Sequence, residues 1–198
     1  GQYARALADG AVLRALAFAY AARFDSAGVV REDDLAAGRD FFATYDTRQG
    51  GFSARHGAVV ELVVPRGPRR SAVSAFVSLR ELRVRENFTG FALDPRGDRF
   101  EQTYDAVTAG LAASHRASFT LFGRAQSWEL GLAARHDVTT QAMRRQRAVD
   151  DVAFATPVDA DVRATDIGLY ADLELRLHSR VAVRGDRKST RLNSSHSS

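Results

Sequence analysis

The sequence has no cysteine, which excludes a disulfide framework and any metal site built on thiolates. It has no run of about 18 apolar residues, so no transmembrane helix is expected. Glycine-rich phosphate loops, the H-E-x-x-H zinc motif and the G-x-S-x-G nucleophile motif are missing as well. We therefore expect that the protein is not an enzyme and that it binds no cofactor or metal.

Lysine is almost absent, and the position of the one lysine is informative. Lys188 lies in a polar C-terminal stretch, beside one of only two asparagines, whereas the other cationic side chains are all arginines. This stretch, Asp186–His196, resembles the translation of a common sequencing adapter, although an ordinary polar C-terminus is the alternative. We therefore predict a folded part at residues 1–185 and a non-native, disordered tail at residues 186–198. Because the sequence also begins without methionine, we expect a fragment.

The charge pattern does not suggest a nucleic-acid partner. The net charge is +4, and it is +2 for residues 1–185, because the tail holds three basic residues and one acidic residue. Arginine alternates with aspartate and glutamate along the chain, and the only basic cluster is Arg144–Arg147. A nucleic-acid-binding protein needs basic residues gathered on one face, so no such partner is expected.

Alternation with a period of two residues recurs along the chain and indicates β-strands. In Ala164–Leu177, one parity is leucine, isoleucine and alanine, and the other is mostly charged. A helical stripe fits Ala11–Asp25 about equally well, but the later segments do not fit a helical period. In Ser71–Asn87 the alternation of apolar and polar residues shifts by one position near Arg80 and Glu81, which predicts a β-bulge. The predicted strands are Ala11–Asp25, Phe52–Val64, Ser71–Asn87, Tyr104–Ser118, Ser127–Thr139, Ala164–Leu177 and a cut strand that begins at Arg180.

Two kinds of connection alternate between these strands. The short ones are Pro65–Pro68, Phe122–Ala125 and Leu177–Arg180, and the long polar ones are Ser26–Gly51, Phe88–Thr103 and Thr139–Arg163. Short turns on one side and long loops on the other are typical of outer-membrane barrels. We predict an all-β fold: a partial antiparallel transmembrane β-barrel in meander order, with about seven strands. The alternative is a soluble or secreted β-sandwich binding module, in which strands are usually shorter.

Six stretches of the sequence are informative about its family. They are Gly28–Leu35, Ala43–Gly51, Arg85–Phe91, Gly97–Tyr104, Asp166–Leu175 and Val181–Gly185. Together they resemble the barrel of a TonB-dependent outer-membrane receptor. The resemblance implies a barrel of about 22 strands with a plugged lumen. It implies uptake of a scarce ligand (a siderophore, vitamin or oligomeric nutrient) across the outer membrane. The implied partners are outer-membrane lipid, an unknown small-molecule ligand, and the TonB complex through a plug that these residues do not include.

Arginines of the long connections are the candidate ligand-binding residues. They are Arg31, Arg39, Arg48, Arg96 and Arg99. Arginine binds anionic groups through charge-assisted hydrogen bonds, which suits an anionic siderophore or lipopolysaccharide phosphates. The alternative is that these dispersed side chains are simply solvated. No catalytic residues are predicted, since even the neighbours His136 and Asp137 would point to opposite faces of a strand.

The alternation also predicts which side chains share a face. We expect a continuous convex, lipid-facing surface and a concave surface that carries the charges. The convex set is Leu16, Phe18, Tyr20, Leu130, Leu132, Leu169 and Leu173, and the concave set is Arg23, Glu129, Asp172 and Glu174. A wall of this size leaves two unpaired edges, so we expect residues 1–185 not to form a stable soluble monomer.

Overall fold

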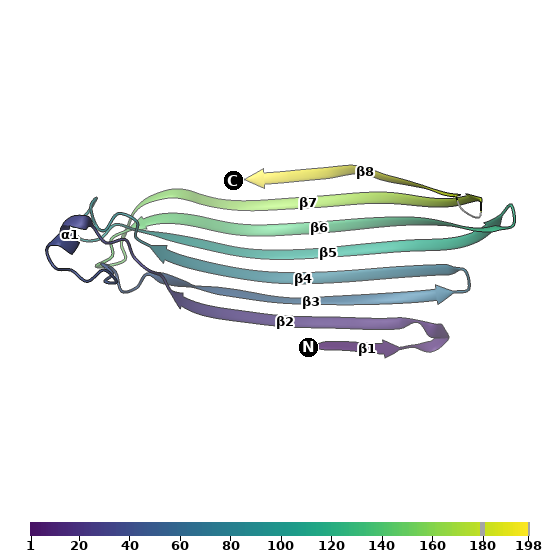
Figure 1. Ribbon diagram of the computed structural model, residues 1–198, viewed down its shortest axis with the longest axis horizontal. Helices are drawn as coiled ribbons and strands as arrows, with labels where there is room; N and C mark the ends of the chain where they lie inside the picture. Colours follow the sequence, from purple (N-terminus) through teal and green to yellow (C-terminus); the bar gives the residue numbers. More distant parts are fainter. Residues whose placement is uncertain (179–180, 198) are drawn as a thin grey trace.

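The computed structural model describes residues 1–178 and 181–197, with side chains up to residue 185. Eight strands form one antiparallel sheet in which each strand pairs with the next along the chain (Figure 1). The strands are β1 Gln2–Ala6, β2 Val12–Asp25, β3 Gly50–Arg66, β4 Arg69–Glu86, β5 Arg99–Leu121, β6 Arg124–Gln146, β7 Ala153–His178 and β8 Val181–Ser197. The predicted antiparallel meander is confirmed, and one sheet takes the place of the two packed sheets of a sandwich.

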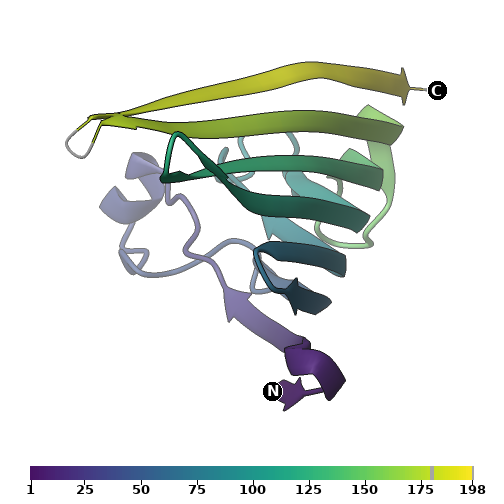
Figure 2. The same ribbon diagram turned by 90° about the vertical axis from the view of Figure 1, so that its right-hand side faces the viewer.

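The sheet is open and twisted, with β1 and β8 as its two edges (Figure 2). Strands β2 to β7 contain 14 to 26 residues. About 9–11 residues are enough for a strand to cross a bilayer, so each of these strands exceeds that length. Two short helices, η1 Ala8–Gly10 and α1 Glu32–Ala36, lie in connections. Neither is long and apolar enough to cross a membrane.

The long loops lie at one end of the sheet and the short turns at the other (Figure 1). The short connections expected at Pro65–Pro68 and Phe122–Ala125 are confirmed in place, and each is two residues long: residues 67–68 join β3 to β4, and residues 122–123 join β5 to β6. The long loops are residues 26–49, 87–98 and 147–152. The expected loop over Thr139–Arg163 is wrong, because most of it belongs to β6 and β7. Polar cross-strand pairs such as Thr140 and Asp161, whose oxygens are 2.6 Å apart, continue the ladder beyond the apolar residues.

Three further details differ from the prediction. Strand β1 was not expected, because its five residues show no clear alternation; it pairs only with Val12–Leu16. The predicted bulge at Arg80 and Glu81 is wrong, since the register of β4 with both neighbours is unbroken there. The register shifts instead between β6 and β7, near Met143 and Arg145.

The last strand bears on the predicted tail. Its expected first residue, Arg180, lies outside the described residues. The backbone of residues 186–197, expected to be disordered and packed on nothing, continues β8 and pairs with β7. The non-native origin of that segment stays a prediction.

The register divides the side chains between an apolar face and a polar face. Leu132 lies opposite Leu169 and Trp128 opposite Leu173, whereas Glu129 lies opposite Asp172 on the other face. The apolar face carries a band of side chains that are 37–56% exposed: Val60, Leu62, Val73, Val77, Leu79, Val107, Leu111, Leu130, Leu132, Val138, Ile167, Leu169 and Leu173. The buried apolar residues of the described chain are six alanines and one valine. The large apolar side chains are therefore on the outside of the sheet rather than in a core.

Strand β2 has the opposite phase to the one predicted. Leu16, Phe18 and Tyr20 lie on the polar face, and Arg23 lies on the apolar face. The row of paired residues that starts at Leu16 crosses the sheet through Val59, Phe76, Gly110, Arg135 and Asp166. The side chains on both faces of β2 are mostly apolar: alanines alternate with large side chains. The alternation therefore could not decide which of the two sets lies on the apolar face of the sheet. The prediction is correct for β6 and β7, where one parity is charged.

Three aromatic rings on the polar face each lie over a glycine of the neighbouring strand. The directly opposite pairs are Phe18 with Gly57, Phe76 with Gly110 and Tyr170 with Gly131. A Cβ atom at these glycines would come within 2.2–2.5 Å of the ring. Only glycine leaves room for such a ring, and the contact fixes the register of the strands.

Candidate functional site

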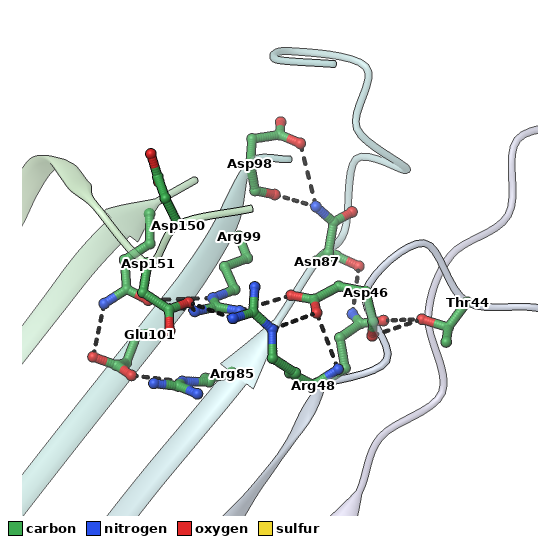
Figure 3. Close-up of polar contacts among 12 residues, drawn as sticks. Thr44, Asp46, Arg48, Arg85, Asn87, Asp98, Arg99, Glu101, Asp150 and Asp151 are labelled. Atoms are coloured by element: carbon green, nitrogen blue, oxygen red, sulfur yellow. Dashed lines mark hydrogen bonds and ion pairs between the residues drawn. The ribbon is translucent and has the colours of Figure 1, made fainter. Parts of the chain in front are cut away.

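Arg99, the first residue of β5, is the centre of a buried polar cluster at the loop end (Figure 3). It is 1% exposed. Its Nη1 donates to Oδ2 of Asp46 at 2.9 Å, and its Nε and Nη2 donate to Oε1 of Gln146 at 3.2 and 3.1 Å. Nη2 also donates to Asp151. One guanidinium thus connects the loop 26–49, the end of β6 and the loop 147–152.

Glu101 extends the cluster to β4. Its Oε1 accepts from Nε2 of Gln146 at 2.9 Å, and its Oε2 accepts from Arg85 at 2.7 Å and Arg83 at 3.1 Å. Glu101 and Asp46 are both buried, and each is bonded to arginine. A buried charge is tolerated when it is paired and hydrogen-bonded in this way, and removal of one partner is strongly destabilising.

The Asp46 carboxylate stays ionised despite its burial. Burial by itself raises the pKa of Asp46, but the hydrogen bond from Arg99 and the Arg48 backbone N–H bond lower it. The two arginine charges lower it further, so that the pKa lies below the ordinary value of an aspartate. Arg48 also lies 3.0 Å from Asp151. Arg48 and Arg99 are therefore bridged by the same two aspartates.

Asn87 and Asp98 hold the two ends of the loop 87–98 together. The side-chain amide of Asn87 donates to the backbone oxygen of Asp98 and, at 3.2 Å, to its Oδ1. The Asn87 Oδ1 accepts from the backbone N–H groups of Thr89 and Gly90, and Gln49 donates to the Asn87 backbone oxygen at 3.2 Å. The loop is thus closed on itself and tied to the loop 26–49.

Tyr45 joins the same two loops nearer the surface. Its hydroxyl donates to Asp34, and its ring lies 5.5 Å from that of Phe91. The guanidinium of Arg39 lies 4.0 Å from the Tyr45 ring centroid, and that of Arg31 lies 5.4 Å from it. The hydrogen bonds from Tyr45 and Arg31 lower the pKa of Asp34.

The predicted ligand-binding arginines therefore have four different environments. Arg99 is buried and fully used by the cluster, which makes it a structural residue. Arg31 and Arg39 flank Tyr45, and Arg96 is exposed and pairs with Asp94 at 2.9 Å. The hydrogen bonds from Arg96 lower the pKa of Asp94. Arg48 alone borders a large pocket.

That pocket, the arginine pocket, encloses about 640 Å³ on the apolar face at the loop end. Its arginines are Arg23, Arg48, Arg83 and Arg85, and its walls also include Asp25, Glu81, Phe24 and Phe52. Glu101 pairs with two of these arginines and Asp46 with a third. Opposite charges are therefore closely balanced, and the pocket is suited to a polar ligand more than to a strongly anionic one.

Sequence reasoning missed the acidic and amide members of the cluster, which are Asp46, Asn87, Asp98, Glu101, Gln146 and Asp151. One signal was present, because Asn87 is the only asparagine before the C-terminal stretch. The partners of Arg99 could not be predicted, since they lie 47 to 53 residues away along the chain.

No protein-family model and no curated protein matches this chain. Within the described residues, no group of three or more histidine, aspartate or glutamate side chains is placed to hold a metal ion.

Proposed function

We propose that residues 1–185 form part of the wall of an outer-membrane β-barrel, in a receptor of the TonB-dependent kind that takes up a scarce ligand. The observation that carries this proposal is the apolar face. A continuous band of large apolar side chains is exposed on one side of the sheet, while the buried apolar residues are almost all alanine. Soluble monomers rarely expose apolar patches beyond a few hundred Å², whereas lipid accepts such a surface without cost.

The backbone is also suited to a bilayer. From β3 to β7 the strands pair with both neighbours over most of their length, as a lipid environment requires. The edges β1 and β8 require further strands on either side, and these complete the barrel in the proposal. Charged pairs such as Arg14 with Glu61, at 2.9 Å, lie on the polar face, which faces the lumen.

The receptor part of the proposal is supported by where the resembling stretches lie. Ala43–Gly51 contains Asp46, and Gly97–Tyr104 contains Arg99 and Glu101, the centre of the buried cluster. Arg85–Phe91 contains Arg85, which pairs with Glu101. The stretches that resemble the receptor family therefore lie where the loop end has most of its buried hydrogen bonds and ion pairs. The intact gene tests this part: it should encode a plug and further strands. A gene for a complete soluble domain that ends near residue 185 would contradict it.

The lipid-facing surface can be tested with the only tryptophan, Trp128, which lies on the apolar face. The intact receptor encoded by the complete gene, with any tryptophan outside residues 1–185 replaced by phenylalanine, is reconstituted in vesicles whose lipids carry bromine on their acyl chains. We expect strong quenching of Trp128 fluorescence. In the control, the double variant Trp128→Phe/Ser127→Trp moves the indole to the opposite face at the same depth, and quenching should be weak. Equal quenching of the two proteins, or none in either, would contradict the proposal.

A further inference from the structure

Charged side chains on the apolar face mark where a bilayer would end. On β4, the apolar part of this face is bounded by Arg69 at the turn end and by Glu81 at the loop end. Residues 70–80 lie between these two charges, and about 9–11 residues are enough for a strand to cross a bilayer. Asp105 of β5 lies directly opposite Glu81. In the proposed barrel, the hydrocarbon of the membrane therefore ends at the row of Glu81 and Asp105.

The arginine pocket begins at this boundary and lies on the same face. In the next row toward the loops, Phe52 of β3 pairs with Arg23 on one side and with Arg83 on the other. Two residues along a strand span about 7 Å, so this row lies at the depth of the lipid headgroups. Arg23, Arg83 and Glu81 are all exposed, and a ligand can therefore reach them.

Three charged side chains of the pocket are not used by the protein. Arg23, Asp25 and Glu81 line the pocket, and none of them has a hydrogen bond or an ion pair with the part of the chain that the structure describes. The one contact of this kind at Arg23 is with the Phe52 ring, whose centroid lies 6.0 Å from the guanidinium. The pocket thus offers a strong donor and two acceptors that are free to bind a ligand.

This combination favours a hydroxyl-rich ligand over an anion. A hydroxyl both donates and accepts hydrogen bonds, so it can use Arg23 and the two carboxylates alike. A phosphate only accepts, and the two carboxylates repel it, while the other three arginines of the pocket already pair with carboxylates. The volume of about 640 Å³ is typical of ligand pockets and has room for a disaccharide.

We propose that the arginine pocket binds the saccharide headgroup of a membrane glycolipid. The hydroxyls bond to Arg23, Asp25 and Glu81, and the acyl chains lie on the apolar band next to the pocket. That band begins at Leu79 and Val107, which are 46% and 45% exposed on the same face. A lipid uses the pocket and the band together, whereas a free sugar uses the pocket alone. The inference rests on the proposed barrel, because a bilayer is what places lipid against this face.

The test uses the intact receptor encoded by the complete gene, with a single tryptophan next to the pocket. Leu79→Trp introduces it, and Trp128 and any tryptophan outside residues 1–185 are replaced by phenylalanine. The receptor is reconstituted in phosphatidylcholine vesicles that contain a small fraction of digalactosyl diacylglycerol with brominated acyl chains. We expect this glycolipid to quench the fluorescence more than brominated phosphatidylcholine at the same fraction. The preference should be about ten-fold, as expected for hydrogen bonds to charged groups.

Single substitutions separate the pocket from the charge of the surface. Arg23→Leu and Glu81→Leu should each remove most of the preference for the glycolipid. Asp105→Leu is the matched control, because Asp105 is also an exposed carboxylate of the boundary row but is not a wall of the arginine pocket. Its replacement should leave the preference within about two-fold of the parent value.

The barrel proposal and this inference can fail separately. If brominated phosphatidylcholine alone does not quench the introduced tryptophan, the barrel proposal fails and the inference fails with it. If it does quench, but the glycolipid is not preferred or brominated phosphatidylglycerol is preferred equally, only the inference is overturned. The inference is also overturned if Asp105→Leu loses the preference as Glu81→Leu does, or if the soluble digalactoside without acyl chains displaces the lipid at equal concentration.

Discussion

The two ends of the sheet are held together in different ways. At the loop end, side chains from the loops 26–49 and 147–152 and from strands β4, β5 and β6 are connected around the buried Arg99. At the turn end, two-residue turns join β3 to β4 and β5 to β6, and Phe122 in the second of these turns is 85% exposed. The buried side chain of Gln126 also bonds there to the backbone of Leu121, Arg124 and Arg176. Buried charged pairs therefore connect the loops at the loop end, whereas backbone turns and uncharged hydrogen bonds connect the strands at the turn end. Substitutions should have large effects at the first end and small ones at the second.

The largest effect is expected from Arg99→Leu. This change removes the shorter of the two ion pairs of the buried Asp46 carboxylate and leaves only the one with Arg48 at 3.4 Å. It also removes the donors of Gln146 Oε1, so we expect the free energy of unfolding in detergent micelles to fall by about 3–5 kcal/mol. Trypsin should also cut the loop 26–49 faster. Arg96→Leu is the control, because Arg96 is exposed and pairs only with Asp94, and its effect should stay below about 0.5 kcal/mol. Equal effects would show that the cluster does not hold the loop end.

Between the two ends, Gly131 provides a test of the ring-over-glycine contacts. A Cβ at Gly131 would lie 2.2 Å from the Tyr170 ring, whereas one at Gly168 would have no atom within 4 Å. Displacement of the ring would also break the 2.7 Å hydrogen bond from Tyr170 to Glu129. Gly131→Ala should therefore destabilise the sheet by about 1–3 kcal/mol, measured by chemical denaturation. Gly168→Ala should be neutral, and a similar loss in both variants would refute this explanation.

The loop end should also respond to acid. Because the pKa of Asp46 is lowered in the folded state, its contribution to stability is fully present above the unfolded pKa of about 3.9 and is lost as the pH falls through the folded value. Hydrogen exchange of the loop 26–49 should therefore show no titration attributable to Asp46 between pH 8 and 5. Protection should then decrease below about pH 4. Asp46→Asn should remove the Asp46 part of this acid response, and a response already present between pH 8 and 5 would contradict it.

The sequence predicted correctly which side chains share a face where one parity was charged, as in β6 and β7, although both strands are longer than predicted. It failed for β2, because alanine on one side and large apolar residues on the other give no sign of which side belongs to the apolar face of the sheet. That choice is made by the register with β3, where Leu16 lies opposite Val59. The same limit applies to the site. Arg99 was recognised as a loop arginine, but only the fold brings Asp46 and Gln146 to it, and burial then makes it structural.

The smallest effect is expected at the turn end. Phe122 and Gly123 both have positive φ, 51° and 69°, as in a type I′ hairpin turn, where asparagine followed by glycine is preferred. Phe122→Asn should therefore stabilise the protein by up to about 1 kcal/mol, since a bulky side chain is disfavoured in this conformation and little contact is lost. Phe42→Asn is the matched control at the loop end: Phe42 is 90% exposed and is not among the residues with positive φ. Its replacement should leave the unfolding midpoint in denaturant unchanged. If both substitutions stabilise equally, removal of an exposed phenylalanine is the cause, and backbone conformation is not what distinguishes the turn end.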